Sequence, residues 1–200
     1  MMNNIEIVTK YINVTENQYT KIQQMYDIYE FWNNKINLIS RNDFNNFYEH
    51  HVLHSLTISH YFKFANDERI IDIGTGGGFP GIPLAIYFSN VHFILVDSIG
   101  KKIKIVKDIV DSLQLNNIEV ICSRVENLNL HCDYALGRAV SHVDNFLKLT
   151  KNISNRVLYL NGSNILPCSA CCKTVSFNLY EYFREPFFES KQLIYSKFAD

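Results

Sequence analysis

Residues 70–81 read Ile-Ile-Asp-Ile-Gly-Thr-Gly-Gly-Gly-Phe-Pro-Gly, an apolar run that leads straight into a loop with five glycines. The apolar part is typical of a buried strand. Glycine tolerates positive φ and has no Cβ, so the loop can turn sharply and a ligand can lie against its N–H groups. Pro80 and Pro83 suit the first turn of a helix, which the apolar residues 82–88 can continue. The stretch therefore predicts a strand, a ligand-binding loop and a helix, the opening of a βαβ unit.

Two classes of ligand use a glycine loop of this kind. A dinucleotide site requires G-x-G-x-x-G with an acidic residue about 20 residues later. The positions that fit this spacing are Gly76, Gly78, Gly81 and Asp97. The same letters read from Asp72 spell D-x-G-x-G-x-G, with Asp97 closing the next strand.

The second pattern resembles the first motif of the class I S-adenosylmethionine-dependent methyltransferases. The loop positions in register are Asp72, Gly74, Gly76 and Gly78. In that family the loop lies beside the methionine moiety, and the acid after the second strand, here Asp97, accepts hydrogen bonds from the ribose hydroxyls. S-adenosylmethionine is a sulfonium cation without phosphates, so an acid at position 72 suits it better than a pyrophosphate. The predicted cofactor is S-adenosylmethionine.

The length, composition and net charge of the chain limit which kinds of protein it can be. The 200 residues suggest one domain, and 47% of them are hydrophobic, enough to bury a core. With a formal net charge of −1, there is no global basic field for nucleic acid, so any RNA contact must come from a local patch. No apolar run approaches the roughly 18 residues of a membrane span, and the N-terminus has no export signal. We therefore expect a cytoplasmic monomer with no membrane segment.

Cysteines and histidines do not predict a metal site. The five cysteines, an odd number, are expected to be reduced thiols. Cys168, Cys171 and Cys172 form a C-x2-C-C cluster, but no second pair of zinc ligands follows at a suitable spacing. His50 and His54 have the i, i+4 spacing of a metal site but lack the intervening Glu of H-E-x-x-H. The alternatives for these histidines are that they are polar or partly buried side chains of the fold, or that they contact a substrate.

Apolar periodicity predicts the order of the elements. Two helices come first, over residues 16–37 with an apolar stripe through Met25, Tyr29, Trp32 and Ile36, and from a cap at Asp43 to about residue 62. The later strands are expected at 91–96, 118–122, 133–136, 156–160, 174–183 and 192–198. Helices are expected at 82–88, 101–113 and 142–149. The last two strands are expected to pair antiparallel at the edge of the sheet.

This alternation implies an α/β fold: a doubly wound, Rossmann-like, seven-stranded and mostly parallel sheet of the class I methyltransferase type. Residues 1–65 would form an N-terminal helical appendage, and residues 66–200 the S-adenosylmethionine-binding domain. Right-handed crossovers place the loops after the first four strands along one edge. One cleft is therefore expected to gather residues 74–79, Asp97, Val125, Glu126 and Arg138.

Further motifs narrow the resemblance. In chain order they are Asn-Leu-Ile-Ser (37–40), His51-x-x-x-Ser55, Asp-Ile-Gly-Thr-Gly-Gly-Gly-Phe-Pro-Gly-Ile-Pro-Leu-Ala (72–85), Val-Asp-Ser-x-x-Lys-Lys (96–102), Ser-Arg-Val-Glu (123–126) and Arg-Ala (138–139). Together they resemble the small-subunit (16S) ribosomal RNA N7-guanine methyltransferase family, also called the glucose-inhibited division protein B family. The similarity covers nearly the whole chain, and the long motif through Gly-Phe-Pro-Gly-Ile-Pro is specific.

The resemblance implies roles for individual residues. Cofactor contacts would fall on Gly74, Phe79, Val125, Glu126 and Arg138, joined by Asp97 through the class I analogy. Residues on the substrate side would be Asn37, Arg124, Arg138 and Lys191. The pattern usually has Arg where this chain has Lys191, and Lys cannot make the planar two-pronged contact of a guanidinium. Other departures on the substrate side are His50 for Arg, His54 for Asp and Asn161 for Lys.

The implied reaction transfers a methyl group from S-adenosylmethionine to N7 of a guanine in 16S ribosomal RNA or in the small ribosomal subunit. Guanine N7 carries an in-plane lone pair, so no general base is required and positioning can contribute up to roughly 7 to 11 kcal/mol. Arg138 would fix the cofactor or the base; an ion pair with Glu126 or Asp133 is the alternative for this residue. The alternative function is a protein that binds S-adenosylmethionine or a nucleotide without catalysis, as the altered substrate-side residues suggest.

Overall fold

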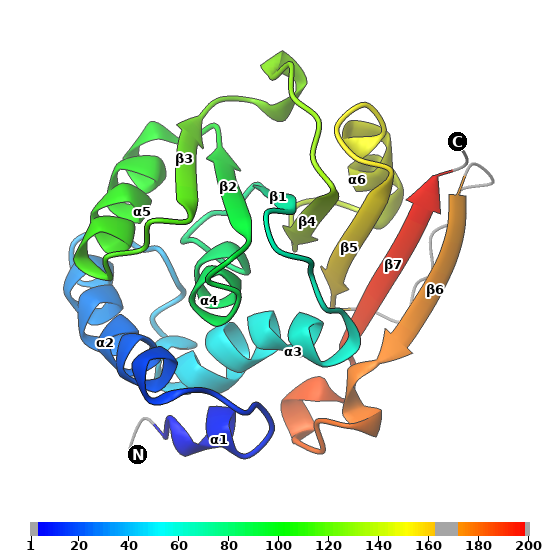
Figure 1. The fold of residues 1–200 in the computed structure, drawn as a ribbon. Coiled ribbons are helices and arrows are strands. Elements are labelled where there is room, and N and C mark those ends of the chain that lie inside the picture. The colour runs from blue at the N-terminus through cyan, green and yellow to red at the C-terminus, as the bar shows by residue number, and fades with distance from the viewer. Residues whose placement is uncertain (1–3, 163–171, 199–200) are drawn as a thin grey trace.

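The structure, a computed structural model, describes residues 4–162 and 172–198. Its sheet has seven strands in the order β3-β2-β1-β4-β5-β7-β6 (Figure 1). The strands are β1 Arg69–Ile73, β2 His92–Asp97, β3 Ile118–Cys122, β4 Tyr134–Arg138, β5 Arg156–Asn161, β6 Cys172–Asn178 and β7 Gln192–Phe198. Strands β1 to β5 pair in parallel, whereas β7 is antiparallel to both β5 and β6. This arrangement confirms the predicted fold class and the predicted antiparallel pair at the edge.

Helices cover both faces of the sheet. They are α1 Glu6–Thr9, α2 Glu16–Asn33, α3 His54–Tyr61, α4 Gly81–Tyr87, α5 Gly100–Ser112 and α6 Val143–Thr150. Successive residues of a strand point to opposite faces. Ile70 accordingly packs into an apolar core with α2 to α5, whereas Ile71 packs with α6 on the other side. The N-terminal helices therefore share one core with the sheet.

Helix α2 ends earlier than its apolar pattern predicts. It begins with a capping box, in which the Thr15 hydroxyl accepts from Gln18 N and the Gln18 side chain accepts from Thr15 N. It ends at Asn33, whose buried side-chain oxygen accepts hydrogen bonds from the backbone N–H groups of Leu38 and Ile39, each at 2.9 Å. The predicted end at residue 37 is therefore wrong. Ile36 lies beyond the helix and is 36% exposed.

The expected second helix, from residue 43 to about 62, is not one regular helix. A 3₁₀ turn over Phe44–Asn46 and a π-helix over Phe47–Leu53, here called η2, precede α3. Asp43 makes no capping hydrogen bond; its carboxylate instead accepts from the imidazoles of His50 and His51. The prediction of a cap at Asp43 is wrong because both carboxylate oxygens are engaged by these imidazoles. A π-helix of this kind is rare and frequently marks a functional site.

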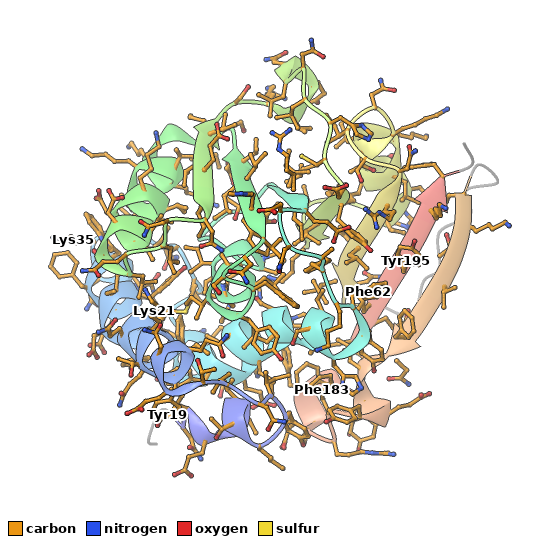
Figure 2. The ribbon with its side chains drawn as sticks, in the orientation of Figure 1. Tyr19, Lys21, Lys35, Phe62, Phe183 and Tyr195 are labelled. Atoms are coloured by element: carbon orange, nitrogen blue, oxygen red, sulfur yellow. The ribbon has the colours of Figure 1, made fainter. Side chains whose placement is uncertain are left out.

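Among the long-range contacts that hold the N-terminal helices against the rest of the chain are those of Lys21 and Phe62 (Figure 2). Lys21 of α2 donates from Nζ to the carbonyl oxygens of Leu113 and Gln114, at the carboxyl end of α5. A cation is favourable there because carbonyl groups at a helix C-terminus lack partners within the helix. Phe62, just after α3, stacks obliquely on Tyr195 of β7 with 5.1 Å between ring centroids.

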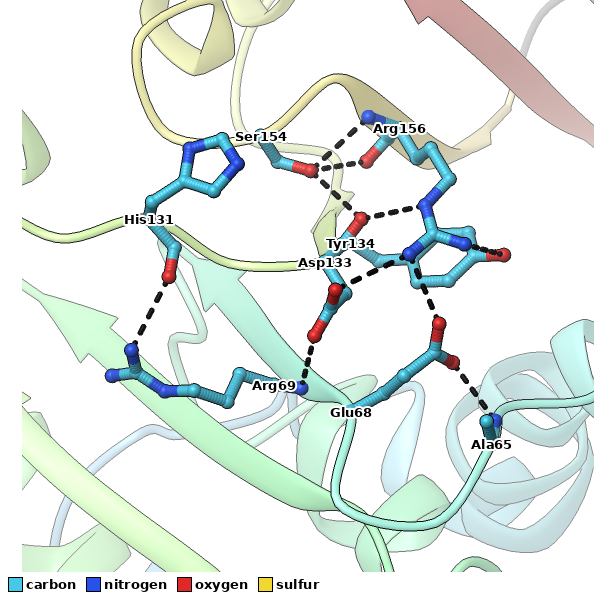
Figure 3. Close-up of polar contacts among 8 residues, drawn as sticks. All are labelled: Ala65, Glu68, Arg69, His131, Asp133, Tyr134, Ser154 and Arg156. Atoms are coloured by element: carbon cyan, nitrogen blue, oxygen red, sulfur yellow. Dashed lines mark hydrogen bonds and ion pairs between the residues drawn. The ribbon is translucent and has the colours of Figure 1, made fainter.

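A polar network closes the amino-terminal ends of β1, β4 and β5 (Figure 3). Arg156 Nη2 lies 2.9 Å from Glu68 Oε1 and 3.4 Å from Asp133 Oδ1, and Asp133 also accepts from the backbone N–H of Arg69. Asp133 is thus engaged at the edge of the sheet opposite to the glycine loop. It is not the partner of Arg138.

The first of the two C-terminal strands, predicted over 174–183, begins two residues earlier and ends five residues earlier in the structure. Strand β6 covers Cys172–Asn178, and residues 179–181 form a 3₁₀ turn where the strand was expected to continue to 183. Strand β7 has the predicted bounds. Between them, Pro186–Phe188 form another short turn that returns the chain toward the sheet. Cys168 and Cys171 lie outside the described residues.

Candidate functional site

The glycine loop leaves β1 with its backbone in the left-handed region. Gly74, Gly76 and Gly78 have φ values of 68°, 60° and 91°, conformations that L side chains rarely adopt. The N–H groups of Gly74 and Thr75 both donate to the carbonyl of Val96, at 2.8 and 3.0 Å, so the loop is tied to β2. The Tyr29 hydroxyl of α2 donates to the Gly77 carbonyl at 2.6 Å. The loop is therefore fixed from both sides.

Asp72 lies buried beneath this loop. Its Oδ2 accepts from the Thr75 hydroxyl at 2.6 Å and from the Gly81 N–H at 2.9 Å, while its Oδ1 has no hydrogen-bond partner among the described residues. Burial raises the pKa of Asp72 to about 6, although both hydrogen bonds act in the opposite direction. The structure thus places Asp72 as an internal support of the loop.

Two hollows open beside the loop, where the sequence predicted one cleft. The first, here called the Asp97 hollow, has a volume of about 360 Å³ and lies over the ends of β1, β2 and β3. Among its lining residues are Gly74, Asp97, Ile99, Arg124, Val125, Glu126 and Val140. The Asp97 carboxylate accepts from Gly76 N at 3.0 Å and from Ile99 N at 2.9 Å. These bonds hold it at the wall of the hollow.

The second, here called the Arg138 hollow, has a volume of about 480 Å³. Among its lining residues are Leu38, Asp43, His50, His51, His54, Gly74, Gly76, Phe79, Lys102, Arg138, Phe187 and Lys191. Gly74 lines both hollows, so the two adjoin at the first glycine of the loop.

The structure distributes the predicted site residues between these hollows. Asp97, Val125, Glu126 and the predicted substrate-side residue Arg124 lie at the Asp97 hollow, whereas Phe79, Arg138 and Lys191 lie at the Arg138 hollow. Asp72 and Gly78 line neither hollow and belong to the loop's support. Asn37 is exposed next to Leu38, which lines the Arg138 hollow.

Arg138 reaches from the end of β4 toward η2. Its Nη1 donates to the His50 carbonyl and its Nη2 to His51 Nδ1, each at 3.2 Å. The guanidinium also lies 5.0 Å from the centroid of the Phe79 ring. Burial lowers the pKa of Arg138 to about 10, so it remains a cation at neutral pH. In the described ranges Arg138 forms no ion pair with Glu126 or Asp133, and the alternative of such a pair is wrong.

The histidines surround the Arg138 hollow from η2 and α3. His50 stacks on Phe187, with 3.9 Å between ring centroids. His54 is 6% exposed, and its Nε2 has no hydrogen-bond partner within residues 4–162 and 172–198. Burial is the largest cause that lowers the pKa of His51, to about 4, followed by the charge of Arg138. His51 is therefore neutral at physiological pH. No group of three or more potential metal ligands occurs among the described side chains.

Three contributors to the site were missed from sequence. Asn33 holds the connector that bears Leu38, Asp43 binds two histidines, and Phe187 forms part of the wall. The acidic residue was read as a helix cap, which fits its position before an apolar pattern. No sequence signal connects Phe187 with His50, because 137 residues separate them and only the fold brings them together.

No helix of the described residues is both long enough and apolar enough to span a membrane.

Comparison with known proteins identifies the family. The sequence profile of GidB, described as rRNA small subunit methyltransferase G, matches residues 18–165. A protein of Phocaeicola vulgatus named "Ribosomal RNA small subunit methyltransferase G" is 42% identical over 205 residues, covering 96% of this chain and 97% of its own. The protein of the same name from Bacteroides thetaiotaomicron is 41% identical over 207 residues, covering 96% and 100%.

Solved structures agree on the fold. A SAM-dependent methyltransferase from Aquifex aeolicus superposes with a TM-score of 0.54 at 13% identity, over 72% of this chain and 89% of that chain. A fibrillarin/Nop5p complex contains a chain with a TM-score of 0.55 at 15% identity, over 74% and 80%. At such identities the likeness concerns the fold alone. The sequence profile and the bacterial relatives confirm the family predicted from the motifs, and the chain belongs to the rRNA small subunit methyltransferase G family.

Proposed function

We propose that this protein transfers a methyl group from S-adenosylmethionine to N7 of a guanine in 16S ribosomal RNA, without a general base. The observation that carries the proposal is the meeting of two unlike hollows at Gly74. One presents the carboxylate of Asp97, and the other is rich in cations. The name shared by the relatives, ribosomal RNA small subunit methyltransferase G, supports the RNA substrate.

The Asp97 hollow fits an adenosyl cofactor. Asp97 is fixed by two backbone N–H groups, and each carboxylate oxygen retains acceptor capacity for a ribose hydroxyl. Gly74 has no room for a side chain, because a Cβ at this position would lie 3.0 Å from both methyl carbons of Val140 in the wall, so only its backbone can face a ligand here. Val125 is buried in the wall of this hollow and offers an apolar surface for a base. Gly74, Asp97, Val125 and Glu126 are therefore the proposed cofactor-binding residues here.

The Arg138 hollow fits an anionic substrate. Its described lining contains the cations Lys102, Arg138 and Lys191, and the single carboxylate there, Asp43, already accepts from two histidines. A guanidinium has five N–H donors, and two of those on Arg138 are engaged by η2. The remaining donors can bind the oxygen of a guanine or a phosphate. Arg124 and the exposed Asn37 are proposed to contact RNA outside this hollow.

This reaction requires the protein to position the guanine against the methyl group, and it does not require a general base. Bound S-adenosylmethionine would supply an electrophilic methyl group on a sulfonium centre, and N7 of guanine already carries the lone pair that accepts it. His51, the neutral histidine nearest to Arg138, has its Nδ1 directed at the guanidinium and is not free to accept a substrate proton. Arg138 can hold the base near the attack position, an effect that can contribute up to roughly 7 to 11 kcal/mol.

The test is to incubate the purified protein with tritiated S-adenosylmethionine and either naked 16S ribosomal RNA or 30S particles. The expected product is labelled 7-methylguanine after nuclease digestion, and the better of the two substrates identifies the assembly state that is recognised. Cofactor binding without transfer to either substrate supports the alternative, a binding protein without catalysis. Label on another base or position contradicts the proposed acceptor.

A further inference from the structure

Arg138 stands at the end of a chain of polar contacts that begins at Asp43. The Asp43 carboxylate lies 2.7 Å from Nε2 of His51, and His51 Nδ1 lies 3.2 Å from Nη2 of Arg138. Building on the proposed function, we infer that Asp43 and His51 are positioning residues, which fix the direction of the Arg138 guanidinium toward the substrate. Neither side chain needs to touch the reacting atoms for this role.

The contacts select one tautomer of His51. An ionised carboxylate only accepts hydrogen bonds, so the nitrogen facing Asp43, Nε2, carries the proton. A guanidinium only donates, so the nitrogen facing Arg138, Nδ1, carries the lone pair. Burial acts to raise the pKa of Asp43, but hydrogen bonds from His50 and His51, and the charges of these imidazoles when they are protonated, outweigh it and lower that pKa. Asp43 is therefore ionised at neutral pH, as this tautomer requires.

The imidazole of His51 cannot turn freely. Its ring lies 6.3 Å from the ring of Phe47 in a stacked arrangement and 5.3 Å from that of Phe79. Phe79 also supports the face of the Arg138 guanidinium. One aromatic side chain thus packs against both members of the contact, which keeps the acceptor and the donor in register.

The π-helix supplies the second acceptor. In η2 the N–H of His54 donates to the Glu49 carbonyl, five residues earlier, and the His50 carbonyl accepts from Arg138 Nη1. The guanidinium therefore meets a carbonyl and an imidazole from adjacent residues of one turn. In the described ranges it has no carboxylate partner to orient it, so these neutral acceptors set its direction.

The first test is Asp43→Asn, which keeps the shape of the side chain and removes its charge. Loss of the partner that orients a metal-ligating side chain typically costs about 10- to 100-fold, and we expect a loss of the same order for a partner that orients a guanidinium. We expect kcat/KM for RNA methylation to fall by that factor through kcat, with cofactor affinity within about 3-fold of wild type. Asp144→Asn is the matched control, because Asp144 of α6 also pairs with a histidine, His142, but neither of these two residues lines a hollow. An equal loss in the control, or none in Asp43→Asn, would overturn the inference.

A double-mutant cycle asks whether Asp43 acts through Arg138. In an Arg138→Ala background, Asp43→Asn should lower methylation by less than about 2-fold further. If the two losses multiply instead, Asp43 acts independently of Arg138 and the inference is wrong. Should Asp43→Asn fail to fold, the pair His51→Gln and His51→Phe replaces it. Gln can still donate to Asp43 and accept from Arg138, so it should retain more activity than Phe; equal losses would refute the positioning role.

The tautomer provides a readout that does not depend on activity. The ¹⁵N shifts of the His51 ring in the folded wild-type protein should show a neutral imidazole protonated at Nε2, and Asp43→Asn should disturb that signature. A proton on Nδ1 in wild type would overturn the inference. This measurement also separates the two proposals, since a protein that makes no 7-methylguanine can still show the expected tautomer.

Discussion

The Asp97 hollow and the Arg138 hollow adjoin at Gly74, yet different parts of the chain build them. The first is lined mostly by residues at the carboxyl ends of β1, β2 and β3, the places where a doubly wound sheet offers ligands its loops. The second also uses the glycine loop and the carboxyl ends of β4 and β5, but it adds walls from η2, from the connector after α2, and from the segment between β6 and β7. Backbone geometry therefore decides the first hollow, and side-chain packing between distant segments decides the second.

We expect the largest effect from a substitution at Gly74, the residue that lines both hollows. Gly74→Val places a β-branched residue at a φ of 68° and pushes its Cβ to 3.0 Å from Val140. Left-handed backbone costs about 1 to 2 kcal/mol and overpacking about 1 to 3 kcal/mol. We expect the loop to relieve this strain by leaving its ligand-binding conformation, so cofactor affinity should fall by about 30- to 5000-fold in titration calorimetry. Gly100→Ala is the control, since its Cβ would meet only Cys122 Sγ at an ordinary 3.7 Å. Near-normal binding by Gly74→Val would show that the loop does not contact the cofactor.

A substitution at Arg138 should have a slightly smaller effect and should distinguish the roles of the two hollows. Arg138→Ala removes the donors that the Arg138 hollow presents, and loss of one preorganised donor typically lowers kcat by about 100- to 1000-fold. We expect at least about a 100-fold fall in single-turnover methylation, more than for any histidine variant, with a smaller change in cofactor affinity. Wild-type activity in this variant would remove Arg138 from the mechanism.

A substitution at Asp72 tests the residue that supports the glycine loop from beneath, and it tests neither hollow. Its folded pKa of about 6 lies above the ordinary value of 3.8, so between these pH values the folded state binds more protons than the unfolded state. The contribution of Asp72 to the free energy of unfolding therefore falls as pH rises from about 4 to about 6. Asp72→Asn removes this slope, so the variant should gain about 2 kcal/mol relative to wild type between pH 4 and pH 7.

Urea unfolding at a series of pH values measures this gain. The Asn amide will add a constant offset, because its second polar atom occupies the place where Oδ1 has no hydrogen-bond partner among the described residues. Only the pH dependence of the difference in unfolding free energy between the variant and wild type tests the raised pKa of Asp72. Asp111→Asn, an exposed carboxylate of α5, should leave the wild-type profile unchanged. Parallel curves for Asp72→Asn and wild type would mean that Asp72 titrates normally in the folded protein.

We expect the smallest effect from a substitution at Lys191, on the proposed substrate side of the site. Lys191 lines the Arg138 hollow with its Nζ 4.8 Å from the Phe187 ring centroid. Lys191→Arg offers a planar fork that can bind a phosphate through two parallel hydrogen bonds. Affinity for 16S ribosomal RNA should rise by about 2- to 5-fold in filter binding, whereas Lys197→Arg on β7 should have no effect. Unchanged affinity in both variants would place Lys191 outside the RNA contact.

Sequence reasoning succeeded where structure is local. The strand before the glycine loop, the acid that ends β2 and the order of the strands along the chain followed from apolar runs and glycine spacing, because buried parallel strands are nearly continuous in apolar residues. It failed between residues 33 and 62. There, Asn33 ends α2 by bonding to the backbone of the connector, and Asp43 binds His50 and His51 instead of capping a helix.

The sequence by itself determined the sheet, the glycine loop and the family, since each depends on residue types at short, fixed spacings. Only the tertiary structure decided that the expected cleft is a pair of hollows, that Arg138 meets neutral acceptors on a π-helix, and that Phe187 faces His50. Those contacts join segments tens of residues apart. Their geometry depends on how the helices and the β6–β7 pair pack around the sheet, which no local pattern encodes.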